Sequence, residues 1–187
     1  MSSLANLIIT LLSLGTLVAL VALGLLVVWL AIGYFNRSTS ESIRPLILWV
    51  SANALRIGLI VSLVSVAGSL FFSNVVGFLP CELCWWQRIF LYPQVVIFAA
   101  ALLYERRGKP IGPVFEISAV LSAISFLISL FQYYGSTWNE NLLAVCSTTG
   151  VSCAKTYFVE FGFITIPVMS LTASALLLAI VLSRRFA

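Results

Sequence analysis

The sequence predicts an all-α integral membrane protein. Of its 187 residues, 61% are hydrophobic and only 9% are charged, and the mean hydropathy is +1.12. Ordinary soluble domains contain about 25% charged residues, so this chain lacks the polar surface that such a domain needs. The apolar residues also fall in long runs separated by polar segments, a pattern typical of membrane-spanning helices. We therefore expect a bundle of transmembrane helices.

The first two spans are expected in the N-terminal part of the chain. The run Leu4–Tyr34 exceeds the roughly 20 residues that cross a bilayer core, and no basic segment precedes it, so we expect a retained helix rather than a signal peptide. The polar segment Asn36–Pro45 is expected to be a short loop. The second span is uninterrupted over Ile57–Leu79, with Leu46–Leu55 as a helical extension and Arg56 at the membrane edge.

Three further spans are expected in the rest of the chain. The third begins at a Cys-x-x-Cys motif and continues to Tyr104, with Pro93 inside it, which membrane helices tolerate but which usually kinks them. The fourth run is Val114–Tyr134 and the last is Ile164–Leu182. Between them lies the longest polar stretch, Gly135–Phe161, which contains a second pair of cysteines.

Basic residues predict the orientation of these spans. Because consecutive spans alternate in direction, the basic segments all fall on one side, which the positive-inside rule assigns to the cytoplasm. The N-terminus and both cysteine pairs then fall on the extracytoplasmic side, where disulfides persist. The basic residues that set this orientation are Arg37, Arg44, Arg106, Arg107, Lys109, Arg184 and Arg185.

The composition also excludes several classes of function. The chain contains no histidine, which removes haem ligation by histidine and Ser-His catalysis. Its formal charge of +4 comes from scattered basic residues, so we expect no nucleic-acid surface. We also expect no metal site, since the second cysteine pair lacks the tight spacing of zinc ligands and the chain has no histidine; a four-cysteine zinc site is the alternative.

The Cys-x-x-Cys motif combines Cys81 and Cys84, which are close enough in sequence to pair. If Pro80 opens a helix, Cys81 falls in its first turn, where the helix dipole favours a thiolate. Arg88 lies four residues after Cys84 and shares its helical face, so its charge would favour a thiolate as well. The alternatives are a structural disulfide or half of a zinc site for the motif, and an arginine that snorkels to the lipid head groups for Arg88.

The second pair is Cys146 and Cys153, in a segment of small residues that Gly150 would allow to turn back and close a bridge. We expect this loop to be flexible and exposed, and its bridge to be easily attacked, as in a redox-active disulfide. A structural bridge that only staples the loop is the alternative.

Two motifs resemble the DsbB family of membrane disulfide-generating proteins, in its BdbC-like branch. They are Pro80-Cys81-Glu82-Leu83-Cys84-Trp85-Trp86-Gln87-Arg88-Ile89-Phe90-Leu91-Tyr92-Pro93 and Phe161-Gly162-Phe163-Ile164-Thr165-Ile166-Pro167. The resemblance covers roughly Ile57 to the C-terminus. It implies a four-helix bundle of DsbB type over residues 46–187, preceded by an extra transmembrane helix and a cytoplasmic loop over residues 1–45. Gln87 stands where the proteobacterial members have a glutamate.

The resemblance also implies a function: a thiol:quinone oxidoreductase of the prokaryotic cell membrane that supports disulfide bond formation. A thioredoxin-like extracytoplasmic partner of the DsbA or BdbD type would reduce the Cys146–Cys153 disulfide, with Cys146 as the site of the mixed disulfide. The electrons would pass to Cys81 and Cys84, with a transient bridge from Cys153 to Cys81. Cys84 would pass them to a membrane quinone, ubiquinone or menaquinone, beside Arg88, whose guanidinium can donate hydrogen bonds to a quinone oxygen.

Other residues and functions remain open. Trp85, Trp86 and Tyr92 are candidates for a quinone site, but an interfacial aromatic belt explains Trp85 and Trp86 better. Pro167 and Met169 are candidates for the same pocket from the last helix. The alternative function is a non-enzymatic membrane subunit with structural loop disulfides.

Overall fold

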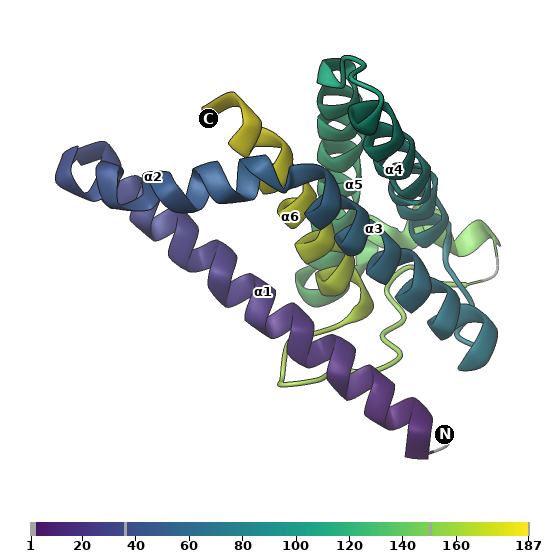
Figure 1. Ribbon diagram of the computed structural model, residues 1–187. Coiled ribbons are helices and arrows are strands. Elements are labelled where there is room, and N and C mark those ends of the chain that lie inside the picture. Colours follow the sequence, from purple (N-terminus) through teal and green to yellow (C-terminus); the bar gives the residue numbers. More distant parts are fainter. Residues whose placement is uncertain (1–2, 36, 150, 187) are drawn as a thin grey trace.

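Figure 1 shows the computed structural model of the chain, which describes residues 3–35, 37–149 and 151–186. Within these residues every element is a helix, and the irregular connections contain one isolated β-bridge between Glu160 and Ile164. The helices are α1 (Ser3–Phe35), α2 (Arg37–Ala52), α3 (Ala54–Leu70), the π-helix η1 (Phe71–Val75), α4 (Glu82–Arg106), α5 (Gly112–Trp138), the 3₁₀-helix η2 (Glu140–Thr149) and α6 (Ile166–Phe186).

Five helical segments are long and apolar enough to cross a membrane. They are α1, α3 with η1, α4, α5 and α6, with mean hydropathies between 1.4 and 2.7. This result confirms the predicted all-α membrane protein and its five spans. Pro93 lies inside α4, as expected.

The segment between the first two spans differs from the prediction. We expected a loop over Asn36–Pro45, but α2 is helical from Arg37 onward and includes Pro45. Polarity keeps a segment out of the bilayer core but does not prevent a helix, whose backbone groups bond to one another. Leu46–Leu55 is likewise no straight extension of α3, because the helix is interrupted at Asn53, whose ψ is 11°. In Figure 1, α2 and α3 therefore meet at an angle.

Helices α3, α4, α5 and α6 pack into a bundle whose interior contains many small polar side chains. In Figure 1, α4 and α5 run side by side and α6 lies next to α5. Gln94 of α4 accepts hydrogen bonds from Ser118 and Ser122 of α5, at 2.7 and 3.1 Å. Between α5 and α6, Ser174 donates to Ser125 at 2.9 Å. Such small residues let membrane helices approach closely and hydrogen bond across their interface.

The two ends of the bundle differ in what they contain. The α3–α4 connection and the segment after α5 lie at the same end as the N-terminus (Figure 1). The α4–α5 turn and the C-terminus lie at the opposite end. The two cysteine-bearing segments thus share one end, as their predicted common side of the membrane requires.

Candidate functional site

Cys81 and Cys84 meet at the start of α4. The helix begins at Glu82, and Cys81 is its N-cap, whose sulfur accepts the backbone N–H of Cys84 at 3.4 Å. The expectation that Pro80 opens the helix is therefore wrong: Pro80 precedes the cap. An N-cap side chain is directed at the unpaired N–H groups of the first turn, which brings the two sulfurs to 2.6 Å from each other. The pair is therefore close enough to form a disulfide.

The second cysteine pair is buried against the first. Cys146 lies in η2 and is 6% exposed, and Cys153 follows it and is 2% exposed. Both belong to one buried cluster with Cys81 and Leu143, against which Cys84 also packs. The expectation of an exposed pair is thus wrong, while the proposed turn at Gly150 falls outside the described residues.

Leu143 and Gly135 explain why the loop folds back onto the bundle. Leu143 is 1% exposed and packs directly on Gly135 near the end of α5. A Cβ atom at position 135 would lie 2.6 Å from Cγ of Leu143, so only glycine leaves room for this contact. Burial of Leu143 brings η2 back over the end of the bundle and carries Cys146 with it.

The surroundings of Cys146 and Cys81 raise the pKa values of their thiols. Burial, followed by a hydrogen bond with Cys153, raises the pKa of Cys146 to about 12. A hydrogen bond with Cys84 and burial raise the pKa of Cys81. Since the thiolate is the species that attacks disulfides, a raised pKa lowers the fraction of Cys146 that can attack at neutral pH.

Gln132 of α5 is a site residue that sequence reasoning missed. Its side chain is 3% exposed, and its Nε2 lies 3.3 Å from Sγ of Cys81 and 3.7 Å from Sγ of Cys84. The same nitrogen lies 3.4 Å from the carbonyl oxygen of Cys153. Gln87 of α4 donates to Oε1 of Gln132 at 2.8 Å. A glutamine within an apolar run is a weak signal, but intramembrane polar residues are functional candidates.

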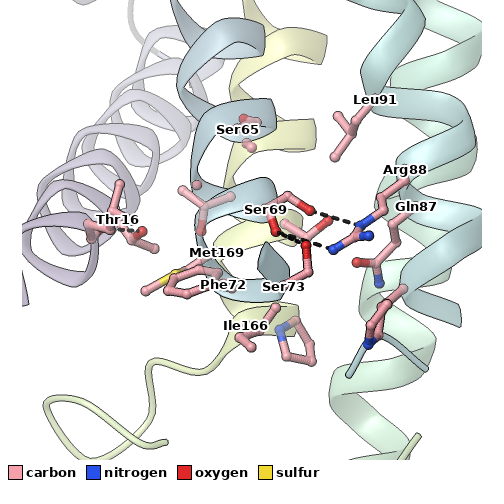
Figure 2. A pocket seen from close by; sticks show the side chains of 18 of the residues that line it. Thr16, Ser65, Ser69, Phe72, Ser73, Gln87, Arg88, Leu91, Ile166 and Met169 are labelled. Atoms are coloured by element: carbon pink, nitrogen blue, oxygen red, sulfur yellow. Dashed lines mark hydrogen bonds between the residues drawn. The ribbon is translucent and has the colours of Figure 1, made fainter. Parts of the chain in front are cut away.

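A cavity of about 420 Å³ lies beside the first cysteine pair. Both Cys84 and Arg88 line it, and residues of α1, α3, α4 and α6 form its walls. Figure 2 shows the arrangement, with Arg88 of α4 directed at Ser69 of α3. Further lining residues are Leu12, Gly15, Thr16, Ala19, Ile60, Val64, Gly68, Phe72, Leu91, Tyr92, Ile166, Pro167, Met169 and Leu176.

Arg88 is fixed across this cavity by hydrogen bonds to α3. Its Nε donates to Oγ of Ser69 at 3.0 Å, and its Nη2 donates to the carbonyl oxygen of Ser69 at 3.2 Å (Figure 2). Tyr92 donates to the same hydroxyl at 3.1 Å. The guanidinium also lies 5.1 Å from the ring centre of Trp85. These contacts hold the half-buried guanidinium against α3.

The aromatic candidates divide between the cavity and the outer surface. Trp85 and Trp86 are 55% and 47% exposed, as an interfacial belt requires, and neither lines the cavity. Tyr92 does line it, as do Pro167 and Met169 of α6.

Most of the chain matches a known protein family. The family model for disulfide bond formation protein DsbB matches residues 51–183, which include all four cysteines, Arg88 and Gln132. The chain belongs to the DsbB family. It is accordingly a membrane oxidoreductase of disulfide bond formation, as the motifs predicted. Helix α1 lies outside the matched region.

Curated relatives of this DsbB-family protein come from bacilli. Disulfide bond formation protein C of Bacillus subtilis is 36% identical over 64% of this chain and 83% of the relative. The SPbeta prophage-derived disulfide bond formation protein B of the same organism is 39% identical over 60% of this chain and 72% of the relative. A probable disulfide formation protein of Oceanobacillus iheyensis is 35% identical over 67% and 77%. No solved structure matches the chain.

Proposed function

We propose that this protein is a thiol:quinone oxidoreductase that reoxidises an extracytoplasmic, thioredoxin-like partner of the DsbA or BdbD type. The electrons pass through Cys146–Cys153 and Cys81–Cys84 to a membrane quinone, ubiquinone or menaquinone. One observation carries this proposal: Cys84 packs against the buried cluster of the other cysteines and lines a cavity with Arg88. A purely structural disulfide needs neither neighbour.

The relay between the two pairs uses thiol–disulfide exchange. The partner's dithiol first reduces the Cys146–Cys153 disulfide and itself becomes a disulfide, with Cys146 in the mixed disulfide. The Cys153 thiolate then attacks the sulfur of Cys81: a Cys81–Cys153 bond forms, the Cys81–Cys84 bond breaks, and its electron pair leaves on Cys84 as a thiolate. Attack of the Cys146 thiolate on Cys153 restores their disulfide and releases Cys81. The shared buried cluster of the four cysteines supports this exchange.

The cavity fits a quinone in size and chemistry. Its volume of about 420 Å³ falls within the range of small-molecule sites, and its walls are mostly apolar with a few polar groups. A guanidinium has five N–H donors, and Arg88 directs two of its nitrogens at Ser69, so further donors remain for a quinone oxygen. A bound quinone would supply a two-electron acceptor at this position.

The orientation in the membrane is part of the proposal. The cysteine-bearing end faces the extracytoplasmic side of the prokaryotic cell membrane, and the opposite end, with the α4–α5 turn, faces the cytoplasm. Residues 46–187 form the DsbB-like redox unit, and residues 1–45 are an addition to it. The positive-inside rule and the family match from residue 51 support this division.

An absorbance assay tests the function. Purified protein is mixed with a reduced thioredoxin-like oxidase and a soluble quinone, and quinone reduction is followed. We expect turnover that depends on the partner and disappears in Cys84→Ser, while this variant stays folded and inserted. A wild-type protein that reduces no quinone, or a Cys84→Ser variant that fails to accumulate, would favour a non-enzymatic subunit with structural disulfides.

A further inference from the structure

Gln132 of α5 contacts both cysteine pairs at once. Its Nε2 group reaches the sulfurs of Cys81 and Cys84, at 3.3 and 3.7 Å, and the carbonyl oxygen of Cys153, at 3.4 Å. The two hydrogens of this one group are thus shared among three acceptors that belong to both halves of the relay. The two cysteine motifs by themselves do not predict that a glutamine of another helix contacts their sulfurs.

Gln87 sets the orientation of this amide. A glutamine side chain can present either its oxygen or its nitrogen to a neighbour. Because Gln87 donates to Oε1 of Gln132 at 2.8 Å, the nitrogen of Gln132 is turned toward the sulfurs. Both side chains are buried, at 5% and 3% exposure, and a hydrogen bond between buried groups is electrostatically stronger than one in water.

We propose that Gln132 is a catalytic residue that donates a hydrogen bond to the Cys84 sulfur as it leaves as a thiolate, and that Gln87 is the positioning residue that orients it. The inference rests on the proposed relay. When the Cys153 thiolate attacks Cys81, the electron pair of the broken Cys81–Cys84 bond moves onto Cys84, and the negative charge moves with it. A thiolate accepts a hydrogen bond more strongly than a neutral sulfur does, so the Gln132 bond strengthens as the charge develops.

The contact with Cys153 gives Gln132 a second role in the same step. Holding the Cys153 carbonyl fixes the backbone of the attacking residue against the pair that it attacks. Exchange requires the attacking sulfur to lie in line with the bond that breaks, and such positioning contributes strongly to rate.

Other groups also act on the Cys84 sulfur and must be kept constant in a test. These are Cys81 at the N-cap of α4, Arg88 on α4, and, from the segment after α5, Cys146, Cys153 and Tyr157. Lys155 also lines the cavity, and Glu82 lies in the first turn of α4. Since Gln132 is neutral, its replacement by a neutral residue leaves all these charges in place.

The decisive variant is Gln132→Met, which keeps the length of the side chain and removes the donor. The matched control is Gln94→Met: Gln94 is also a buried glutamine with cross-helix hydrogen bonds, but it contacts serines rather than sulfurs. A second variant, Gln132→Leu, is also neutral and also lacks the donor, so it leaves the surrounding charges in place. It keeps the test informative if the methionine variant does not fold.

The measurement is iodoacetamide alkylation of Cys84 in the fully reduced protein, quantified by mass spectrometry between pH 6 and 9, a range that we choose to span ordinary thiol titration. Alkylation follows the thiolate fraction. We expect Gln132→Met and Gln132→Leu to slow Cys84 alkylation at pH 7 by about tenfold, which corresponds to one charge-assisted hydrogen bond. Gln94→Met should stay within about twofold of the wild type, a difference too small to represent a hydrogen bond.

The outcomes separate this inference from the proposed function. Unchanged Cys84 alkylation in a folded Gln132 variant, or equal slowing in Gln94→Met, overturns the inference. Since alkylation needs neither quinone nor partner, a wild-type protein without quinone turnover would overturn the proposed function even if the Gln132 effect is present. If both hold, Gln132→Met should also slow oxidation of the partner.

Discussion

Replacement of Arg88 by lysine tests the quinone site most directly. Arg88 donates to Ser69 through Nε and Nη2, at 3.0 and 3.2 Å, which commits one edge of the guanidinium to α3. The other edge remains for a ligand in the cavity that it lines. Lysine keeps the charge but has a single nitrogen, which cannot hold Ser69 and present a planar fork to a quinone at the same time.

The size of the effect follows from this difference. A hydrogen bond to a charged group contributes about 1.5–3 kcal/mol. Arg88→Lys loses one such bond to the quinone, so its KM for quinone should rise by at least about tenfold, since tenfold is about 1.4 kcal/mol. Arg88→Ala loses the charge and the donors together, so we expect an increase of about a hundredfold, equivalent to about 2.8 kcal/mol.

The assay is quinone reduction at saturating reduced partner over a range of quinone concentrations. Arg56→Lys and Arg56→Ala are the matched controls, because Arg56 is also an arginine on a membrane-spanning helix but is exposed and donates to Asn53 instead. Both Arg56 variants should keep the wild-type KM. A wild-type KM in Arg88→Ala would reduce Arg88 to a membrane anchor and refute its assignment to the quinone.

Three further predictions test the relay, the cavity and the topology. Cys146→Ser should lose partner oxidation but still reduce quinone with a small dithiol, since Cys81 and Cys84 remain; retained partner oxidation would contradict the relay. Gly15→Phe should raise the quinone KM, because Gly15 lines the cavity and has no atom within 4 Å of its Cβ position, whereas Gly24→Phe, equally open on the same helix but outside the cavity, should not. In intact cells, Thr148→Cys should react with a membrane-impermeant thiol reagent and Gly108→Cys should be shielded; the reverse pattern would invert the orientation.

The sequence predicted well those features that the bilayer itself imposes. A membrane-spanning helix must satisfy its own backbone and present apolar side chains over about 20 residues, so α4, α5 and α6 follow directly from hydropathy. The closeness of Cys84 and Arg88 was also predictable, because a separation of four residues places both on one face of a helix. Neither inference needs knowledge of how the helices pack.

Features that depend on packing between distant segments were not predictable in this way. The burial of Cys146 follows from the packing of Leu143 on Gly135. The sequence around a glycine near a helix end does not indicate which distant residue packs on it. Gln132 reaches the sulfurs only because α5 docks beside α4 in one particular register. Its importance comes from the partner helix rather than from its own run of sequence.

The position of Cys81 at the N-cap of α4 depends both on the local sequence and on the packing of distant segments. The cap turns its sulfur toward the N–H of Cys84, and Cys81 joins the buried cluster with Leu143, Cys146 and Cys153 while also lining the cavity. Cys84, three residues later, lines the cavity, and Arg88 follows one turn further along α4. A dithiol that exchanges with another disulfide and also faces a membrane cavity must contact the second cysteine pair and the cavity at the same time. The start of a membrane helix is a place where a chain can provide both, because the loop and the bilayer meet there.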